Sequence, residues 1–156
     1  MRILFVCTGN TCRSSMAEVI ARKWLKDNAP GRTDFELASA GLAAYPGSPA
    51  SPEAIEVMSM AGIDLIKHRA KRFCGEHADK SDVIITMTDG HKQAILNSFP
   101  AAALKVFTLS ELADSRSYDI SDPIGQPAAI YLKCAREIQE LVNKIFHKIV
   151  KQTDTR

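Results

Sequence analysis

Short apolar runs alternate with longer amphipathic stretches along this chain. The runs cover residues 2–6, 35–42, 81–87 and 104–109. Runs of this length and composition are typical of strands buried on both faces of a parallel sheet. Helical periodicity follows in each interval, from Ser14 onward and then over residues 51–62 and 88–99. The pattern therefore predicts the order β-α-β-α-β-α-β.

A long amphipathic helix ends the pattern, after a polar segment at residues 110–126. Its apolar stripe, which should pack on the sheet, comprises Cys134, Ile138, Leu141, Val142, Ile145 and Ile149. Strands that alternate with helices form a doubly wound parallel sheet with helices on both faces. We expect a four-stranded α/β sheet in a single domain over residues 1–156, with its ligand beyond the C-terminal ends of the strands.

The composition excludes several classes of protein. The 20 basic and 18 acidic residues leave a net charge of +2, which is too small and too evenly spread for a nucleic-acid surface or a polybasic membrane surface. No apolar stretch approaches the roughly 18 to 20 residues of a membrane span, and the apolar run at the N-terminus is too short for a secretory signal. We expect a cytoplasmic protein that contacts neither nucleic acid nor a membrane, and we expect it to be a monomer.

The four cysteines are too sparse for a disulfide framework in a chain of 156 residues. No Cys or His spacing completes a zinc site, so we expect no metal and no cofactor. Cys74 and Cys134 are assigned to packing. Cys7 and Cys12 need another explanation, because both lie in the loop that follows the first apolar run.

That loop reads CTGNTCRSS over residues 7–15. Amides of a short glycine-containing loop can converge on an anion, and the helix that follows adds free N–H groups and the positive end of its dipole. The loop lacks the second glycine and the Lys-Ser/Thr pair of nucleotide-binding loops. It offers instead a thiol at Cys7, whose thiolate form would be stabilised there, and a guanidinium at Arg13, which can fork onto two phosphoryl oxygens.

Two serines follow the arginine. Ser14 can donate a hydrogen bond to the Cys7 thiolate or cap the helix, and both roles are compatible. Ser15 and Glu18 have the spacing of a capping box. The loop as a whole predicts catalysis on a phosphoryl group, with Cys7 as the nucleophile.

Several short motifs resemble those of the low molecular weight protein tyrosine phosphatases, over nearly the whole chain. They are VCTGNTCRS at residues 6–14, SAG at 39–41, HRAK at 68–71, ITM at 85–87 and DP at 122–123. The resemblance implies the fold of that family and a phosphocysteine intermediate. It implies a loop that holds inorganic phosphate, sulfate or a phosphorylated protein, formed by Thr8, Gly9, Asn10, Thr11, Cys12 and Ser14.

A general acid is the other part of the implied mechanism. The resemblance assigns to Asp122 the protonation of the leaving group and the later activation of water, which is coherent chemistry for a carboxyl group on a mobile loop. From the residues alone, Asp114, Asp119 and Asp122 are nearly equivalent, and Pro123 favours the last only slightly.

The resemblance also implies supports for the loop. Asn10 suits a left-handed backbone position, and in the family such an asparagine is braced by a serine and a histidine, which correspond here to Ser39 and His68. Cys12 could form a reversible disulfide with Cys7 that protects the nucleophile from over-oxidation. The alternative is a loop thiol that never pairs.

Two positions bear on the substrate. Members that act on phosphotyrosine usually carry aromatic residues after the Asp-Pro pair, where this chain has Ile124, and loss of that stacking contact costs about 1 kcal/mol. Thr11 resembles the protein-arginine phosphatases of the family, since a hydroxyl there can hydrogen-bond a guanidinium leaving group. We favour phosphoarginine over phosphotyrosine.

Three other functions fit parts of the pattern. A thiol-dependent arsenate reductase needs two further cysteines, and only Cys74 lies in the relevant region. A phosphocysteine carrier would not need the pair of Arg13 and Asp122, which favours hydrolysis. A non-catalytic module that binds phosphoproteins would not need a reactive thiol beneath the anion.

Overall fold

The computed structural model describes residues 1–155, and Arg156, the last residue of the expected domain, lies outside the described residues. Four parallel strands form one sheet in the order β2-β1-β3-β4. The strands are β1 (Arg2–Cys7), β2 (Glu36–Gly41), β3 (Val83–Thr86) and β4 (Val106–Thr108). The predicted four-stranded parallel sheet is confirmed.

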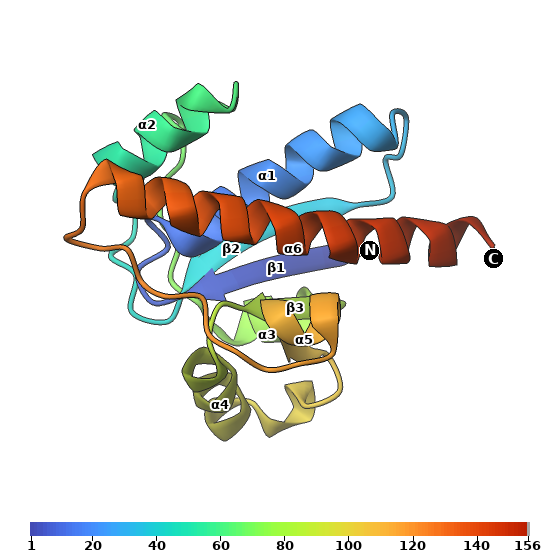
Figure 1. Ribbon diagram of the computed structural model, residues 1–156. Coiled ribbons are helices and arrows are strands. Elements are labelled where there is room, and N and C mark those ends of the chain that lie inside the picture. The colour runs from blue at the N-terminus through green and yellow to red at the C-terminus, as the bar shows by residue number, and fades with distance from the viewer. Residues whose placement is uncertain (156) are drawn as a thin grey trace.

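Helices cover both faces of this sheet (Figure 1). One face carries α1 (Arg13–Asn28), α2 (Pro52–Met60), α5 (Leu109–Asp114) and α6 (Ala128–Asp154). The other face carries α4 (Asp89–Ser98) and the short 3-10 turn η1 (Pro100–Ala102), and α3 (Gly75–Lys80) precedes β3. None of the helices within residues 1–155 is long and apolar enough to span a bilayer.

The central strand β1 divides its side chains between two cores. Ile3, Phe5 and Cys7 belong to the larger core, beneath α1 and α6. Leu4 and Val6 belong to the smaller core, on the side of α4. Alternation along a strand produces this division, and it turns the side chain of Cys7, the last residue of β1, toward the face that α1 covers.

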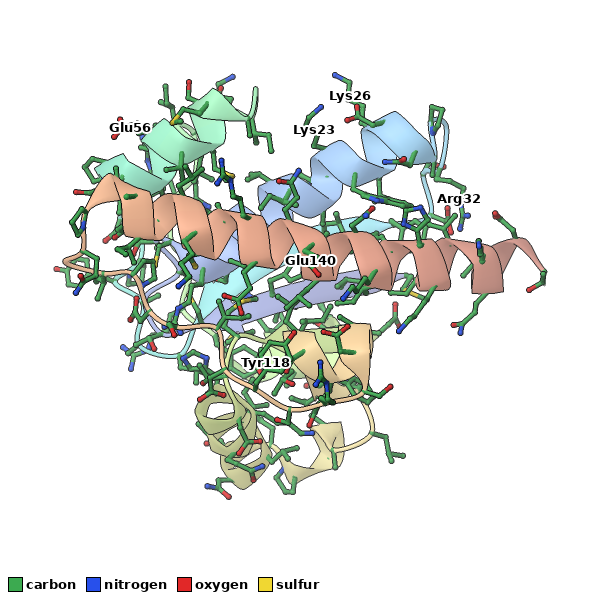
Figure 2. All side chains as sticks on the ribbon, viewed as in Figure 1. Lys23, Lys26, Arg32, Glu56, Tyr118 and Glu140 are labelled. Carbon is green, nitrogen blue, oxygen red and sulfur yellow. The ribbon has the colours of Figure 1, made fainter. Side chains whose placement is uncertain are left out.

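The amphipathic pattern of α6 places its apolar stripe against the sheet and α1. Ile138 and Val142 of this stripe are fully buried, and Lys148 Nζ donates to the carbonyl oxygens of Leu112 and Ala113 at the end of α5. Figure 2 shows Glu140 on the outer surface of α6. The helix therefore fastens α5 to the body of the domain through both packing and hydrogen bonds.

The predicted capping box of α1 is wrong. The helix begins at Arg13, so Ser15 lies inside it, and Cys12 is the residue that precedes its first turn. Ser15 Oγ donates to the Cys12 carbonyl at 2.9 Å. Glu18 accepts hydrogen bonds from Arg22 and from a side chain of β2 instead of returning to the helix start. The tight loop brings the chain into the helix earlier than the periodicity indicates.

Three further expectations need correction. The strand expected at residues 104–109 is shorter, and helix α5 covers its last residue and the start of the polar segment at residues 110–126, because Thr108 and Glu111 form a capping box there. The short helix α3 was not predicted. Cys134 packs in the larger core as expected, but Cys74 is exposed and its Sγ lies 3.2 Å from Nδ1 of His77.

Candidate active site

The loop between β1 and α1 lies at the carboxyl end of the central strand. Its backbone is packed against Gly41, the last residue of β2. A Cβ atom at this position would lie 2.6 Å from the Thr8 carbonyl oxygen and 2.8 Å from the Asn10 nitrogen. The loop can approach β2 this closely only because residue 41 has no side chain. The glycine of the SAG motif therefore shapes the loop.

Asn10 holds the loop in its curved form. Its backbone has a φ of 57°, in the left-handed region where asparagine is among the tolerated residues. Its Nδ2 donates to Ser39 Oγ at 2.9 Å and to Ser14 Oγ at 2.8 Å. Nε2 of His68 lies 2.6 Å from the Asn10 carbonyl oxygen, and Lys71 N donates to Oδ1. The structure thus has both contacts that the resemblance implied.

The sulfur of Cys7 lies at the base of this loop. Cys7 is 1 % exposed, and its Sγ lies 3.0 Å from Ser14 Oγ. Since Ser14 Oγ accepts from Asn10 Nδ2, its own hydrogen can point at the sulfur, which at 3.0 Å is nearer than the other available acceptor, the Ala40 carbonyl oxygen at 3.5 Å. A donor in this position stabilises a thiolate. Ser14 is the second residue of α1 and not its cap, so only the first of its two expected roles fits the geometry.

Several donors of the loop that follows Cys7 have no protein partner. Within residues 1–155, the backbone N–H groups of residues 9–12 donate to no carbonyl oxygen. Arg13 is 3 % exposed, and its buried Nε has no hydrogen-bond partner among the described residues. Unsatisfied buried donors are costly and rare. Free donors in the loop that directly follows Cys7 can be satisfied by a multiply charged oxyanion such as phosphate.

The guanidinium of Arg13 also connects the loop to a distant part of the chain. Its Nη1 donates to the Ile120 carbonyl at 3.0 Å, and Nη2 lies 3.2 Å from Asp122 Oδ2. The segment before α6 reaches this point because Ile120 N donates to the Met87 carbonyl just beyond β3. A carboxyl group is thereby held at the edge of the anion site.

The three aspartates that the sequence left nearly equivalent have different surroundings. Asp122 is the one beside Arg13, and its Oδ1 lies 3.8 Å from Cys12 Sγ. Asp114 pairs with Lys144 and accepts a hydrogen bond from Tyr118, which lies in the segment beside α5 (Figure 2). Asp119 accepts from the backbone of α4. Only Asp122 lies against the guanidinium.

The sequence of this chain matches one known protein family over residues 2–155, which include every residue of the site described above. The family is described as "Low molecular weight phosphotyrosine protein phosphatase". The chain belongs to this family. The expectation of a cysteine-dependent protein phosphatase is confirmed at that level, and the alternatives of a reductase, a carrier and a binding module are set aside.

Three relatives illustrate the range of the low molecular weight phosphatases near this chain. A protein-arginine-phosphatase of Geobacillus stearothermophilus is 39% identical over 148 residues, which cover 95% of each chain. A YwlE arginine phosphatase structure, a cysteine-to-serine mutant with a phosphorylated active-site serine, matches with a TM-score of 0.92 at 34% identity and 97% coverage of both chains. A low molecular weight protein tyrosine phosphatase from T. tengcongensis matches with a TM-score of 0.88 at 42% identity, over 95% of this chain and 99% of the other.

The remaining residues expected at the phosphatase site differ in exposure. Thr8 is exposed and Thr11 is half-buried in the loop, while Ile124 is 64 % exposed beyond the Asp-Pro pair. Cys12 is buried, and burial, with the nearby Cys7 as a second cause, raises the pKa of its thiol to about 12. Cys12 is therefore a neutral thiol at neutral pH, and a Cys7–Cys12 disulfide stays a prediction.

Two polar residues at this phosphatase site were not found from the sequence. Glu18 accepts a hydrogen bond from Ser39 Oγ at 2.5 Å, and Ser39 Oγ in turn accepts from Asn10 Nδ2. His91 lies beside Thr8, on the opposite side of the loop. The helical spacing of Glu18 suggested a cap and a single histidine has no specific spacing, so neither residue gave a usable signal.

Proposed function

We propose that Cys7, Arg13 and Asp122 hydrolyse phosphorylated protein side chains through a phosphocysteine, with the chain acting as one catalytic domain. The observation that carries the proposal is the buried thiol of Cys7 at the end of β1, followed directly by loop amides without a protein partner and by Arg13 with its free Nε. Inorganic phosphate and sulfate would occupy the same cradle. Asp122, at 3.2 Å from the guanidinium, completes the set.

In the first step the Cys7 thiolate attacks phosphorus. A sulfur–phosphorus bond forms while the bond from phosphorus to the leaving group breaks. Asp122 gives its proton to the leaving atom, which departs neutral. Arg13 and the loop amides donate to the three equatorial oxygens, whose negative charge they stabilise as it redistributes in the transition state.

In the second step water replaces sulfur at phosphorus. Asp122, now a carboxylate, accepts a proton from the water as the oxygen–phosphorus bond forms and the sulfur–phosphorus bond breaks. Cys7 leaves as a thiolate, which the Ser14 hydroxyl at 3.0 Å stabilises by hydrogen bonding. Inorganic phosphate then departs, and the enzyme returns to its starting protonation state.

We propose phosphoarginine in proteins as the preferred substrate, ahead of phosphotyrosine. The hydroxyl of Thr11 in the loop can accept a hydrogen bond from a guanidinium N–H, which an aliphatic side chain cannot do. The exposed Ile124 offers no aromatic face to a phosphotyrosine ring. The relative named as a protein-arginine-phosphatase, 39% identical over 148 residues, supports the same preference.

The nucleophile is tested by Cys7→Ser. We expect this variant to lose turnover of an aryl phosphate and to retain binding of inorganic phosphate in calorimetry, because the loop amides and Arg13 remain. Cys74→Ser is the matched control, since Cys74 is exposed and its side chain contacts His77 instead of the loop. This variant should keep wild-type kcat. Full turnover by Cys7→Ser would end the proposal.

The acid and the substrate need separate measurements. Asp122→Asn should lower kcat most for substrates with poor leaving groups, and an equal fall in kcat for good and poor leaving groups would move the acid role elsewhere.

For the substrate, the hydrolysis of phosphoarginine and phosphotyrosine peptides is compared between wild type and Thr11→Ile. The preference for phosphoarginine should fall in the variant, and a wild-type preference for phosphotyrosine that the substitution leaves unchanged would refute the arginine assignment.

A further inference from the structure

His91 is a buried histidine that the proposed reaction does not use. It is the third residue of α4 and is 8 % exposed. Its Nε2 lies 2.9 Å from Thr8 Oγ1, across 83 positions of sequence. Its Nδ1 is also buried, with no hydrogen-bond partner within residues 1–155. A buried polar ring that makes a single contact, and makes it to the residue next to Cys7, requires an explanation.

The ring is a neutral support. Burial, and after it the nearby Arg13 guanidinium, lowers the pKa of His91 to about 4. At neutral pH the imidazole is therefore uncharged and shares one hydrogen with the Thr8 hydroxyl. The neutral ring adds no second positive charge near Arg13, so it holds the loop through its hydrogen bond and leaves Arg13 as the positive group that binds the anion.

The contact completes a symmetrical support of the loop. On the side of β2, Asn10 is held by Ser39 and His68. On the side of β3, Thr8 is held by His91. Since Thr8 directly follows Cys7, a shift of Thr8 would move the amide next to the sulfur. The ring itself is fixed by the first turn of α4, where the His91 amide donates to Thr88 Oγ1 at 3.1 Å.

The same turn of α4 also holds the segment that carries the proposed acid. The Asp89 amide donates to Asp119 Oδ1 at 2.9 Å, three residues before Asp122. The first turn of α4 therefore contacts both the nucleophile loop and the acid segment. A change in either contact would alter the distance between Cys7 and Asp122.

We propose that His91 is a positioning residue that keeps the nucleophile loop in register with the segment carrying Asp122, through its bond to Thr8. The inference rests on the proposed function, because it assumes that Cys7 and Asp122 act on one substrate. It assigns to α4 a part in catalysis, although no side chain of this helix touches the reacting atoms.

The test measures kcat and KM for His91→Leu and His91→Gln with aryl phosphates of graded leaving-group acidity. His91→Leu removes the bond, and we expect kcat to fall about five- to tenfold, the equivalent of one lost hydrogen bond, with a smaller change in KM. The fall should be larger for poor leaving groups. His91→Gln can bond Thr8 again and should recover most of the rate. His147→Leu, at an exposed histidine of α6, is the control and should match wild type.

A second pair of variants breaks the contact from its exposed end. Thr8→Val should lower kcat as His91→Leu does, Thr8→Ser, which keeps a hydroxyl for His91, should lower it less than Thr8→Val, and the Thr8→Val effect should vanish in the His91→Leu background. Because Thr8 is exposed, the comparison of the single variants Thr8→Val and Thr8→Ser decides the matter even if His91→Leu does not fold. Additive effects, no recovery in His91→Gln, or a kcat within twofold of wild type would overturn the inference. Such a result, with Cys7→Ser still inactive, would leave the proposed function standing.

Discussion

Gly41→Ala tests how closely the nucleophile loop depends on the end of β2. The added methyl group would lie 2.6 Å from the Thr8 carbonyl oxygen, 2.8 Å from the Asn10 nitrogen and 2.9 Å from the Gly9 carbonyl carbon. All three are backbone atoms, so no side chain can rotate away. Ordinary contact begins near 3.4 Å, so the loop has to retreat by nearly an ångström.

The cost of that retreat falls on both stability and catalysis. Forcing a methyl group into a filled site costs about 1 to 3 kcal/mol of folding free energy. A displacement of about 1 Å in catalytic groups can cost about a hundredfold in rate. We expect kcat/KM for an aryl phosphate to fall about 30- to 100-fold, and inorganic phosphate to bind more weakly, because the loop amides no longer converge.

The assay is steady-state hydrolysis, with thermal unfolding and phosphate calorimetry on the same samples. Gly90→Ala is the matched control, since the nearest atom to its added methyl, Thr88 Oγ1, lies at 3.6 Å. That variant should keep wild-type kcat and stability within about 1 kcal/mol. A Gly41→Ala protein with wild-type kcat/KM would refute the argument that the missing side chain sets the loop geometry.

Three other outcomes follow from the same contacts. The free energy of unfolding should fall as the pH drops from 6.5 toward about 4, because unfolded His91 binds a proton in this range and folded His91 does not. In denaturant titrations, His91→Gln should remove up to about 3 kcal/mol of that pH dependence. The same change of unfolding free energy with pH in wild type and His91→Gln would contradict this prediction. Iodoacetamide at neutral pH should label exposed Cys74 in the native protein well before buried Cys134, and mass spectrometry showing the reverse order would count against the assigned burial. Asn10→Gly keeps the left-handed backbone but loses the amide bonds to Ser39 and Ser14, and it should lower kcat about tenfold or more, with unchanged kcat as the opposing result.

The strand, loop and helix that open the chain were predictable from local pattern. An apolar run, a glycine-containing polar loop and a helical period indicate their structures over a few residues each, because backbone geometry and burial act at that range. The positions of Cys7 and Arg13 within the loop were sufficient to predict an anion site. The four-stranded parallel sheet followed from the same alternation.

The start of α1 and the exposure of Cys74 were not predictable in this way. Ser15 and Glu18 have the spacing of a capping box, but the path of the loop starts the helix at Arg13 and turns Glu18 toward Ser39. Cys74 and Cys134 look alike as small apolar residues. The apolar stripe of the last helix predicted that Cys134 is buried, but no such pattern surrounds Cys74, and only the tertiary structure shows that Cys74 is exposed.

By itself, the sequence determined the alternation of four strands with helices, the thiol and guanidinium at the end of the first strand, and the residue types that could serve as acid. The tertiary structure alone decided that Asp122, and neither Asp114 nor Asp119, reaches Arg13, and that His91 supports Thr8 from across the sheet. These contacts join positions 83 and more residues apart. They depend on where parallel strands end and on the bond from Ile120 to Met87 that returns the chain to that edge, which no local periodicity records.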